Sequence, residues 1–137
     1  MTMTESMNKK AASVSFRNVT KVYGKDVVAV DNIDLEIEPG KLVTLLGPSG
    51  CGKTTTLRMI AGLEMSTKGA VTIGGVDVTR LPATDRDVSM VFQSYALFPH
   101  MTVIENVSYG LKFSGHPKSD IRNAALEGLG LVGLADF

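Results

Sequence analysis

The chain has 137 residues, enough to close a single hydrophobic core and little more. Its 14 basic residues balance its 14 acidic residues, so no overall charge attracts the chain to nucleic acid or to anionic lipid. Its single cysteine excludes an internal disulfide and a zinc site built from several cysteines, which is typical of a reducing compartment.

The N-terminal stretch, residues 1–12, lacks the apolar core of a signal peptide, so we expect a disordered leader there. Residues 13–137 are then expected to belong to one domain, because no stretch is long enough to act as a linker between two. The longest nearly apolar run, residues 129–135, is too short to cross a bilayer. A role at a membrane would therefore need a membrane-embedded partner.

The beginning of this domain predicts mainly β-structure. Residues 14–19 and 27–30 have the composition of strands, and residues 33–37 alternate apolar with polar, mostly acidic side chains, as a half-buried strand does. Residues 42–46 (LVTLL) form a short apolar run, which is typical of a strand buried on both faces of a parallel sheet.

The next segments predict a helix followed by short β elements. Apolar spacing indicates a helix over residues 54–63. Gly74 and Gly75 separate two short β-type runs, so a tight hairpin is expected around them. Residues 87–92 are a further strand candidate that runs directly into Gln93.

The C-terminal part predicts two helices. Thr102 and Glu105 have the spacing of a capping box, in which each side chain satisfies a backbone N–H at a helix start. We expect that helix to run from about residue 103 to residue 113. A last helix is expected over residues 118–131.

The most informative stretch is GPSGCGKTT, residues 47–55, between the apolar run and the first predicted helix. It matches the phosphate-loop pattern G-x-x-x-x-G-K-[ST] in the strand-to-helix context that the pattern requires. Glycine lets backbone N–H groups curl around a phosphate, and the helix directs its positive end at the anion. The alternative is a glycine-rich turn with an incidental lysine. The nucleotide-binding residues expected here are Gly47, Pro48, Ser49, Gly50, Cys51, Gly52, Lys53, Thr54 and Thr55.

Two side chains of the loop have individual roles in this interpretation. Lys53 adds a mobile positive charge for the outer phosphates, and the hydroxyl of Thr54 is placed to bind Mg²⁺. A phosphate loop alone does not distinguish kinases, GTPases, motor ATPases and transporters. Other segments have to discriminate among these classes.

From about Ser13 to its last residue, the chain resembles the nucleotide-binding subunits of ABC transporters. The residues that carry this resemblance are VYGKDVVAVDNIDLEIEPGKLVTLLGPSGCGKTTTLRMIAGLE, then GGVDV, then RDVSMVFQSYALFPHMTVIENV. The chain is most similar to the ATPases of binding-protein-dependent importers for polyamines, ferric iron, phosphonates or sulfate. The implied fold is α/β: a P-loop NTPase of the ABC type, incomplete, with an N-terminal antiparallel β part, the phosphate-loop strand and helix, and the start of a helical subdomain.

The resemblance also implies roles for residues outside the loop. Tyr23 corresponds to an aromatic residue that stacks on adenine, and Gln93 to a glutamine that contacts Mg²⁺ and the attacking water, so that Lys53 and Gln93 are the expected catalytic residues. The apolar cluster after Gln93 is expected to face transmembrane subunits, although packing inside the helical subdomain is an alternative. Its residues are Tyr95, Ala96, Leu97, Phe98 and Met101.

The implied cofactors are ATP and Mg²⁺. The implied partners are transmembrane permease subunits, a second ATPase subunit in a homodimer and, indirectly, a solute-binding protein, but no nucleic acid. The implied location is peripheral, on the cytoplasmic face of the inner membrane. The transported solute is not implied, because selectivity belongs to other subunits.

Parts of the family's machinery are absent from these 137 residues: an LSGGQ-type signature, an apolar strand ending in Asp-Glu, and a switch histidine. LVGLADF has only a superficial likeness to the apolar-Asp pattern, since Phe137 stands where glutamate would follow. We therefore expect an N-terminal portion that binds Mg-ATP without turnover. We also expect it to be marginally stable, because the strands that would lie beside residues 42–46 are largely missing and an unpaired apolar edge favours aggregation. A stand-alone, non-hydrolytic nucleotide-binding module and another P-loop NTPase, such as a GTPase or small-molecule kinase, are the alternatives.

Overall fold

The computed structural model describes residues 11–95 and 97–134. They form two compact units, one ending at Met90 and the other beginning at Val91, a division that no linker-like composition announces. Of the expected leader, residues 1–10 lie outside the described residues. Ala11 and Ala12 are exposed and have no regular structure.

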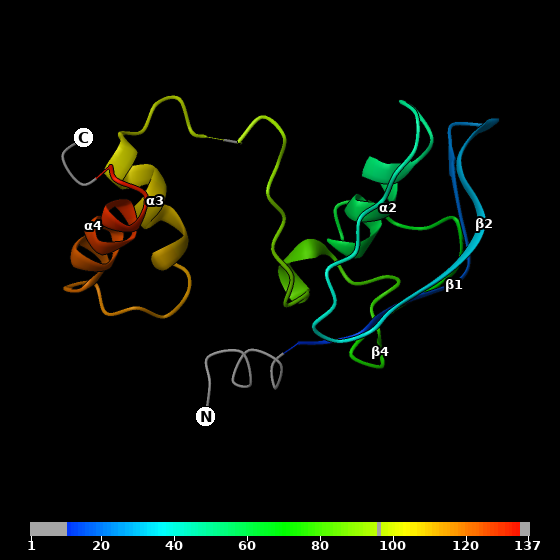
Figure 1. Cartoon of the computed structure of the whole chain (residues 1–137), viewed down its shortest axis with the longest axis horizontal. Coiled ribbons are helices and arrows are strands. Elements are labelled where there is room, and N and C mark those ends of the chain that lie inside the picture. Colours follow the sequence, from blue (N-terminus) through cyan, green and yellow to red (C-terminus); the bar gives the residue numbers. More distant parts are fainter. Residues whose placement is uncertain (1–10, 96, 135–137) are drawn as a thin grey trace. The chain divides into compact units, whose positions relative to one another are not determined.

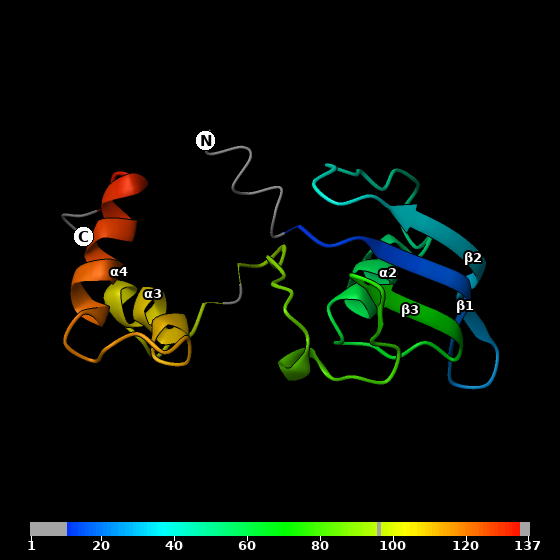
Figure 2. The ribbon, with the colours of Figure 1, turned by 90° about the horizontal axis from the view of Figure 1, so that it is seen from below.

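The first unit contains a four-stranded antiparallel sheet with the strand order β2-β1-β3-β4 (Figures 1 and 2). Its strands are β1 (Val14–Tyr23), β2 (Val27–Ile37), β3 (Lys68–Ile73) and β4 (Val76–Asp77). The two strands expected at 27–30 and 33–37 form the single strand β2. Its pairing with β1 is irregular around Asn32, which has a φ of 45°. The predicted hairpin is confirmed, since Gly74 and Gly75 join β3 to β4 with φ of 58° and 79°.

Helix α2 (Lys53–Ile60) packs on this sheet and closes the core of the first unit (Figure 2). The core consists of buried side chains from three strands, the helix and the segment after β4, with Phe16 and Met59 each 1% exposed. Full burial of an apolar side chain of this size contributes about 1.5–3 kcal/mol. The members are Phe16, Val19, Val30, Met59, Val71 and Val78.

Helix α2 is shorter than the expected 54–63 because a Schellman motif ends it. Gly62, with φ 72°, donates its N–H to the Met59 carbonyl, and the N–H of Leu63 bonds to the Arg58 carbonyl at 3.0 Å. A short 3₁₀ turn, η1 (Ala83–Asp85), follows the sheet.

Two predicted strands are wrong. Residues 42–46 are not in a strand, and Leu42 and Leu46 are 97% and 87% exposed. Residues 87–92 are also irregular, and Val91 is 89% exposed. A strand needs a neighbour to satisfy its N–H and C=O groups, and no described strand pairs with either segment.

The second unit contains α3 (Val103–Leu111) and α4 (Ile121–Leu131), which pack against each other. The predicted capping box is confirmed: Glu105 donates its N–H to Thr102 Oγ1 and accepts the Thr102 N–H at 2.8 Å. Helix α4 starts three residues later than expected, after a turn in which the Asp120 N–H bonds to the Pro117 carbonyl. None of the helices in the described part of the chain has the length and apolar character needed to span a bilayer.

Candidate functional site

The loop of residues 47–52 leads into α2, and its shape depends on glycine. Gly50 and Gly52 have φ of 82° and 91°, a left-handed conformation that favours glycine. A Cβ on Gly52 would collide with the Ala29 carbonyl oxygen of β2 and lie 3.1 Å from Val30 Cγ2. A Cβ on Gly47 would lie 2.6 Å from Cys51 Sγ. Gly52 therefore has no room for a side chain beside the β2 backbone, whereas at Gly47 the Cys51 side chain would have to move.

The Lys53 side chain folds back along this loop. Its Nζ donates to the carbonyl oxygens of Gly47 and Pro48, each at 2.7 Å, and lies 3.4 Å from Cys51 Sγ. An ammonium group is therefore held at the start of the loop, next to the first turn of α2.

The N-terminus of α2 is free to bind an anion. From Gly52 onward, the first backbone N–H with a hydrogen-bond partner is that of Thr56, which bonds to the Gly52 carbonyl at 2.8 Å. Within residues 11–95, the N–H groups of Gly52, Lys53, Thr54 and Thr55 make no hydrogen bond. The first turn of α2 contains no acidic residue. These donors, the helix dipole and the lysine charge fit a phosphate group.

The three consecutive threonines of α2 differ in their surroundings. Thr54 is exposed and Thr55 is half-buried. Thr56 is buried, and its hydroxyl donates to the Gly52 carbonyl at 3.0 Å. Thr54, the residue proposed from the motif to bind Mg²⁺, therefore has an accessible hydroxyl, whereas the hydroxyl of Thr56 serves the fold.

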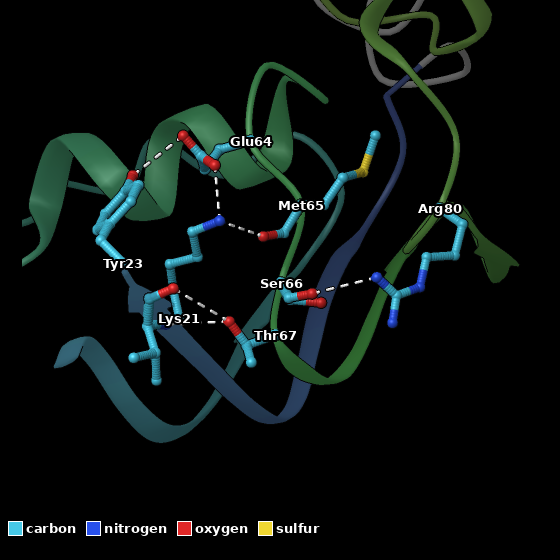
Figure 3. Close-up of polar contacts among 8 residues, drawn as sticks. Lys21, Tyr23, Glu64, Met65, Ser66, Thr67 and Arg80 are labelled. Atoms are coloured by element: carbon cyan, nitrogen blue, oxygen red, sulfur yellow. Dashed lines mark hydrogen bonds and ion pairs between the residues drawn. The ribbon is translucent and has the colours of Figure 1, made fainter. Parts of the chain in front are cut away.

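Tyr23 lies at the end of β1, in a polar cluster that the sequence does not reveal (Figure 3). Its hydroxyl donates to Glu64 Oε2 at 3.1 Å. Lys21 Nζ lies 2.6 Å from Glu64 Oε1, donates to the Met65 carbonyl at 2.9 Å and lies 4.8 Å from the centroid of the Tyr23 ring. The hydrogen bond from Lys21 is the main cause that lowers the pKa of Glu64. The stacking of adenine on Tyr23 stays a prediction.

Gln93 is exposed and lies in the second unit, whereas the phosphate loop lies in the first. Its predicted contacts with Mg²⁺ and water therefore stay predictions. Tyr95 and Leu97 of the apolar cluster are 79% and 70% exposed, whereas Met101 is half-buried. Ala96 lies outside the described residues.

Phe98 belongs partly to the packing of the second unit. Its ring centroid lies 4.6 Å from that of Tyr109 on α3. The Asn106 amide accepts the Phe98 N–H at 2.8 Å and donates to the carbonyls of Phe98 and Met101. Asn106 thus fastens this segment to α3. Sequence reasoning missed it, because a single asparagine inside a helix carries no pattern of its own.

An antiparallel β part, a phosphate loop at the start of α2 and a separate helical unit define a P-loop nucleotide-binding protein. The sequence model of the family described as "ABC transporter" matches residues 30–137, and the chain belongs to this family. Among the P-loop classes left open by the loop alone, the match selects this one.

Curated relatives are closely similar over nearly the whole chain. The chain is 65% identical over 125 residues to the Fe(3+) ions import ATP-binding protein FbpC of Brucella abortus (strain 2308), covering 91% of this chain and 35% of the relative. It is 51% identical over 132 residues to the Fe(3+) ions import ATP-binding protein FbpC 1 of Pectobacterium atrosepticum, covering 96% of this chain and 37% of the relative. The chain thus spans about a third of the length of these relatives. The expected resemblance to importer ATPases is confirmed.

Solved structures agree with the fold. The dimeric structure of MJ0796, a bacterial ABC transporter cassette, matches with a TM-score of 0.76 and 33% identity, covering 86% of this chain and 56% of that one. A post-hydrolysis state of the same cassette, bound to ADP and Pi, matches with a TM-score of 0.70. The expected ABC-type P-loop NTPase fold is therefore confirmed.

Proposed function

We propose that this chain provides the ATP-binding face of an ABC importer's ATPase subunit. The observation that carries the proposal is the loop of residues 47–55, where Gly52 has no room for a side chain, an ammonium group lies along the loop, and N–H groups without a partner among the described residues begin a helix. This arrangement suits a chain of phosphates. The names of the relatives favour ferric iron as the imported solute.

The loop residues have distinct tasks in binding. Backbone N–H groups from Gly52 to Thr55 hold phosphate oxygens, and Lys53 exchanges its carbonyl contacts for the outer phosphates. Tyr23 supports the adenine by stacking, which contributes about 1–3 kcal/mol and tolerates other bases.

Mg²⁺ would be held by the Thr54 hydroxyl and by Gln93, together with the phosphates. The described residues contain no group of three or more His, Cys, Asp or Glu side chains that could hold a metal ion. The ion would therefore need the phosphates of the nucleotide as ligands, which is usual for Mg²⁺ at phosphate sites. When bound, the ion neutralises charge that develops on the phosphates. Gln93 would orient the attacking water.

The proposed partners follow from the importer role. Transmembrane permease subunits would contact the exposed side chains of Tyr95 and Leu97, with Phe98 and Met101 beside them. A second ATPase subunit would complete the catalytic site in a homodimer, and a solute-binding protein would act indirectly. The protein would lie peripherally on the cytoplasmic face of the inner membrane.

These 137 residues would bind Mg-ATP with negligible turnover. Their sequence contains neither an LSGGQ-like stretch nor an Asp-Glu pair to supply a general base.

Calorimetry with Mg-ATP and a phosphate-release assay test this proposal together. We expect a heat of binding for the wild-type chain, none for Lys53→Ala, and negligible phosphate release from either. Circular dichroism of Lys53→Ala controls for unfolding. Absence of binding by folded wild-type chain would refute the proposal, and turnover that survives in Lys53→Ala would refute the assignment of the site.

A further inference from the structure

We infer that Lys21 and Glu64 are positioning residues, which hold the Tyr23 ring at a fixed place so that a nucleotide base can stack on it. This inference rests on the proposed ATP-binding function and extends it to two residues that no motif marks. Neither residue belongs to the phosphate loop.

The three side chains form a closed set of contacts (Figure 3). The Glu64 carboxylate accepts from Lys21 through one oxygen, at 2.6 Å, and from the Tyr23 hydroxyl through the other, at 3.1 Å. The side chains of Lys21 and Glu64 are only 12% and 24% exposed. A charge-assisted contact this short and this protected is more persistent than an exposed ion pair.

The contacts fix the ring at both of its ends. The backbone of Tyr23 is held in β1, opposite Val27 of β2, and its hydroxyl is held by Glu64. Lys21 Nζ lies over the ring at 4.8 Å from its centroid, within the range of a cation–π interaction. Because the ammonium occupies one face of the ring, a base would stack on the opposite face.

The cluster also sets the position of the ring relative to the phosphate loop. Lys21 pairs with Val30 in the β1–β2 ladder, and Val30 lies directly against Gly52. Glu64 follows the C-terminal end of α2, the helix whose N-terminal end forms the loop. Tyr23 is thus tied to both ends of the helix that would bind the phosphates. One nucleotide needs its base and its phosphates held at a fixed separation, and such preorganisation lowers the cost of binding.

The test compares Mg-ATP with inorganic tripolyphosphate, which has no base, by calorimetry on the 137-residue chain. We expect Lys21→Met and Glu64→Gln to weaken ATP binding about 2- to 10-fold, since one side chain loses its prior ordering. We expect tripolyphosphate binding to stay unchanged. The matched control is Lys25→Met, which removes an exposed lysine in the β1–β2 turn and should change neither affinity.

Tyr23→Phe keeps a stacking ring but removes the hydroxyl that Glu64 holds, so it decides the matter if the charge variants fail to fold. We expect it too to weaken ATP binding about 2- to 10-fold and to leave tripolyphosphate unaffected. Equal affinities of Tyr23→Phe and wild type for ATP would overturn the inference, and so would equal losses for both ligands in the folded charge variants. Failure of the wild-type chain to bind either ligand would refute the proposed function instead.

Discussion

Gly52 begins α2 with φ 91° and ψ 0°, and a Cβ at this position would meet the Ala29 carbonyl of β2. Gly50 has a similar φ of 82°, but a Cβ there would have nothing within 4 Å. Substitutions at the two positions can therefore distinguish the cost of a left-handed backbone from the cost of a steric collision. Of the two, only Gly52 carries both costs, because it lies against the backbone of β2.

Gly50→Ala should lower the free energy of unfolding by about 1–2 kcal/mol, the cost of a left-handed residue with a Cβ. Gly52→Ala should cost clearly more, since β2 or α2 must also move. Urea unfolding of the two variants measures the difference. Equal costs would show that the contact between Gly52 and Ala29 does not constrain the loop.

The contacts of Glu64 make the stability of the folded chain depend on pH. The hydrogen bond from Lys21, then that from Tyr23, holds the pKa of Glu64 below its ordinary value of 4.5. A lowered carboxyl pKa stabilises the folded state fully above pH 4.5, and this contribution is lost as the pH falls through the folded-state pKa. The wild-type chain should therefore lose stability below pH 4.5 more steeply than Glu64→Gln. Parallel curves of melting temperature against pH for the two proteins would contradict this.

Elements that depend on neighbours in the sequence could be predicted, and those that depend on distant partners could not. The Thr102–Glu105 box and the Gly74–Gly75 hairpin act within a few residues, so their patterns were sufficient. The apolar run of residues 42–46 indicates burial, but a strand forms only beside another strand, which lies elsewhere in the chain. The division of the chain into two units at Met90 could not be predicted from composition, because it depends on which residues contact each other in the folded chain.

The site shows the same contrast. The phosphate loop was predictable because all its functional groups lie within residues 47–55. The contacts of Tyr23 were not, since Lys21 and Glu64 are 43 positions apart and meet only through folding. The contacts of Arg86 with helix α2 were not predictable for the same reason.

Arg86 connects helix α2 to the irregular segment after β4 through backbone carbonyls. It is 7% exposed, and its guanidinium donates to the carbonyls of Met59 and Ile60 at the end of α2 and to that of Leu81. Burial lowers the pKa of this guanidinium, but arginine stays charged at neutral pH. A cation here also complements the negative end of the helix dipole.

Arg86→Met should lower the free energy of unfolding of the first unit by about 3 kcal/mol, because it removes the guanidinium donors from three buried or partly buried carbonyls, of which that of Met59 keeps only the Gly62 N–H. Arg80→Met is the matched control, since among the described residues Arg80 donates one hydrogen bond, at 3.3 Å, to the Ser66 carbonyl. Denaturant unfolding followed by circular dichroism compares the two. A loss for Arg86→Met no larger than for Arg80→Met would show that this connection contributes little.

At the scale of the whole molecule, the most consequential feature is the apolar surface left open by residues 42–46. Leu42 and Leu46 are 97% and 87% exposed, next to the loop proposed to bind phosphates. Open apolar segments with unpaired backbone groups favour association between chains.

The 137-residue chain should therefore self-associate as its concentration rises, and Leu42→Ser combined with Leu46→Ser should reduce this association. Leu131→Ser is the control, because Leu131 is 85% exposed but ends helix α4, whose backbone bonds are made within the helix. Sedimentation velocity over a range of concentrations measures both effects. If Leu131→Ser reduced association as much as the double variant, exposed apolar area in general would be the cause. A specific role of residues 42–46 requires the larger reduction in the double variant.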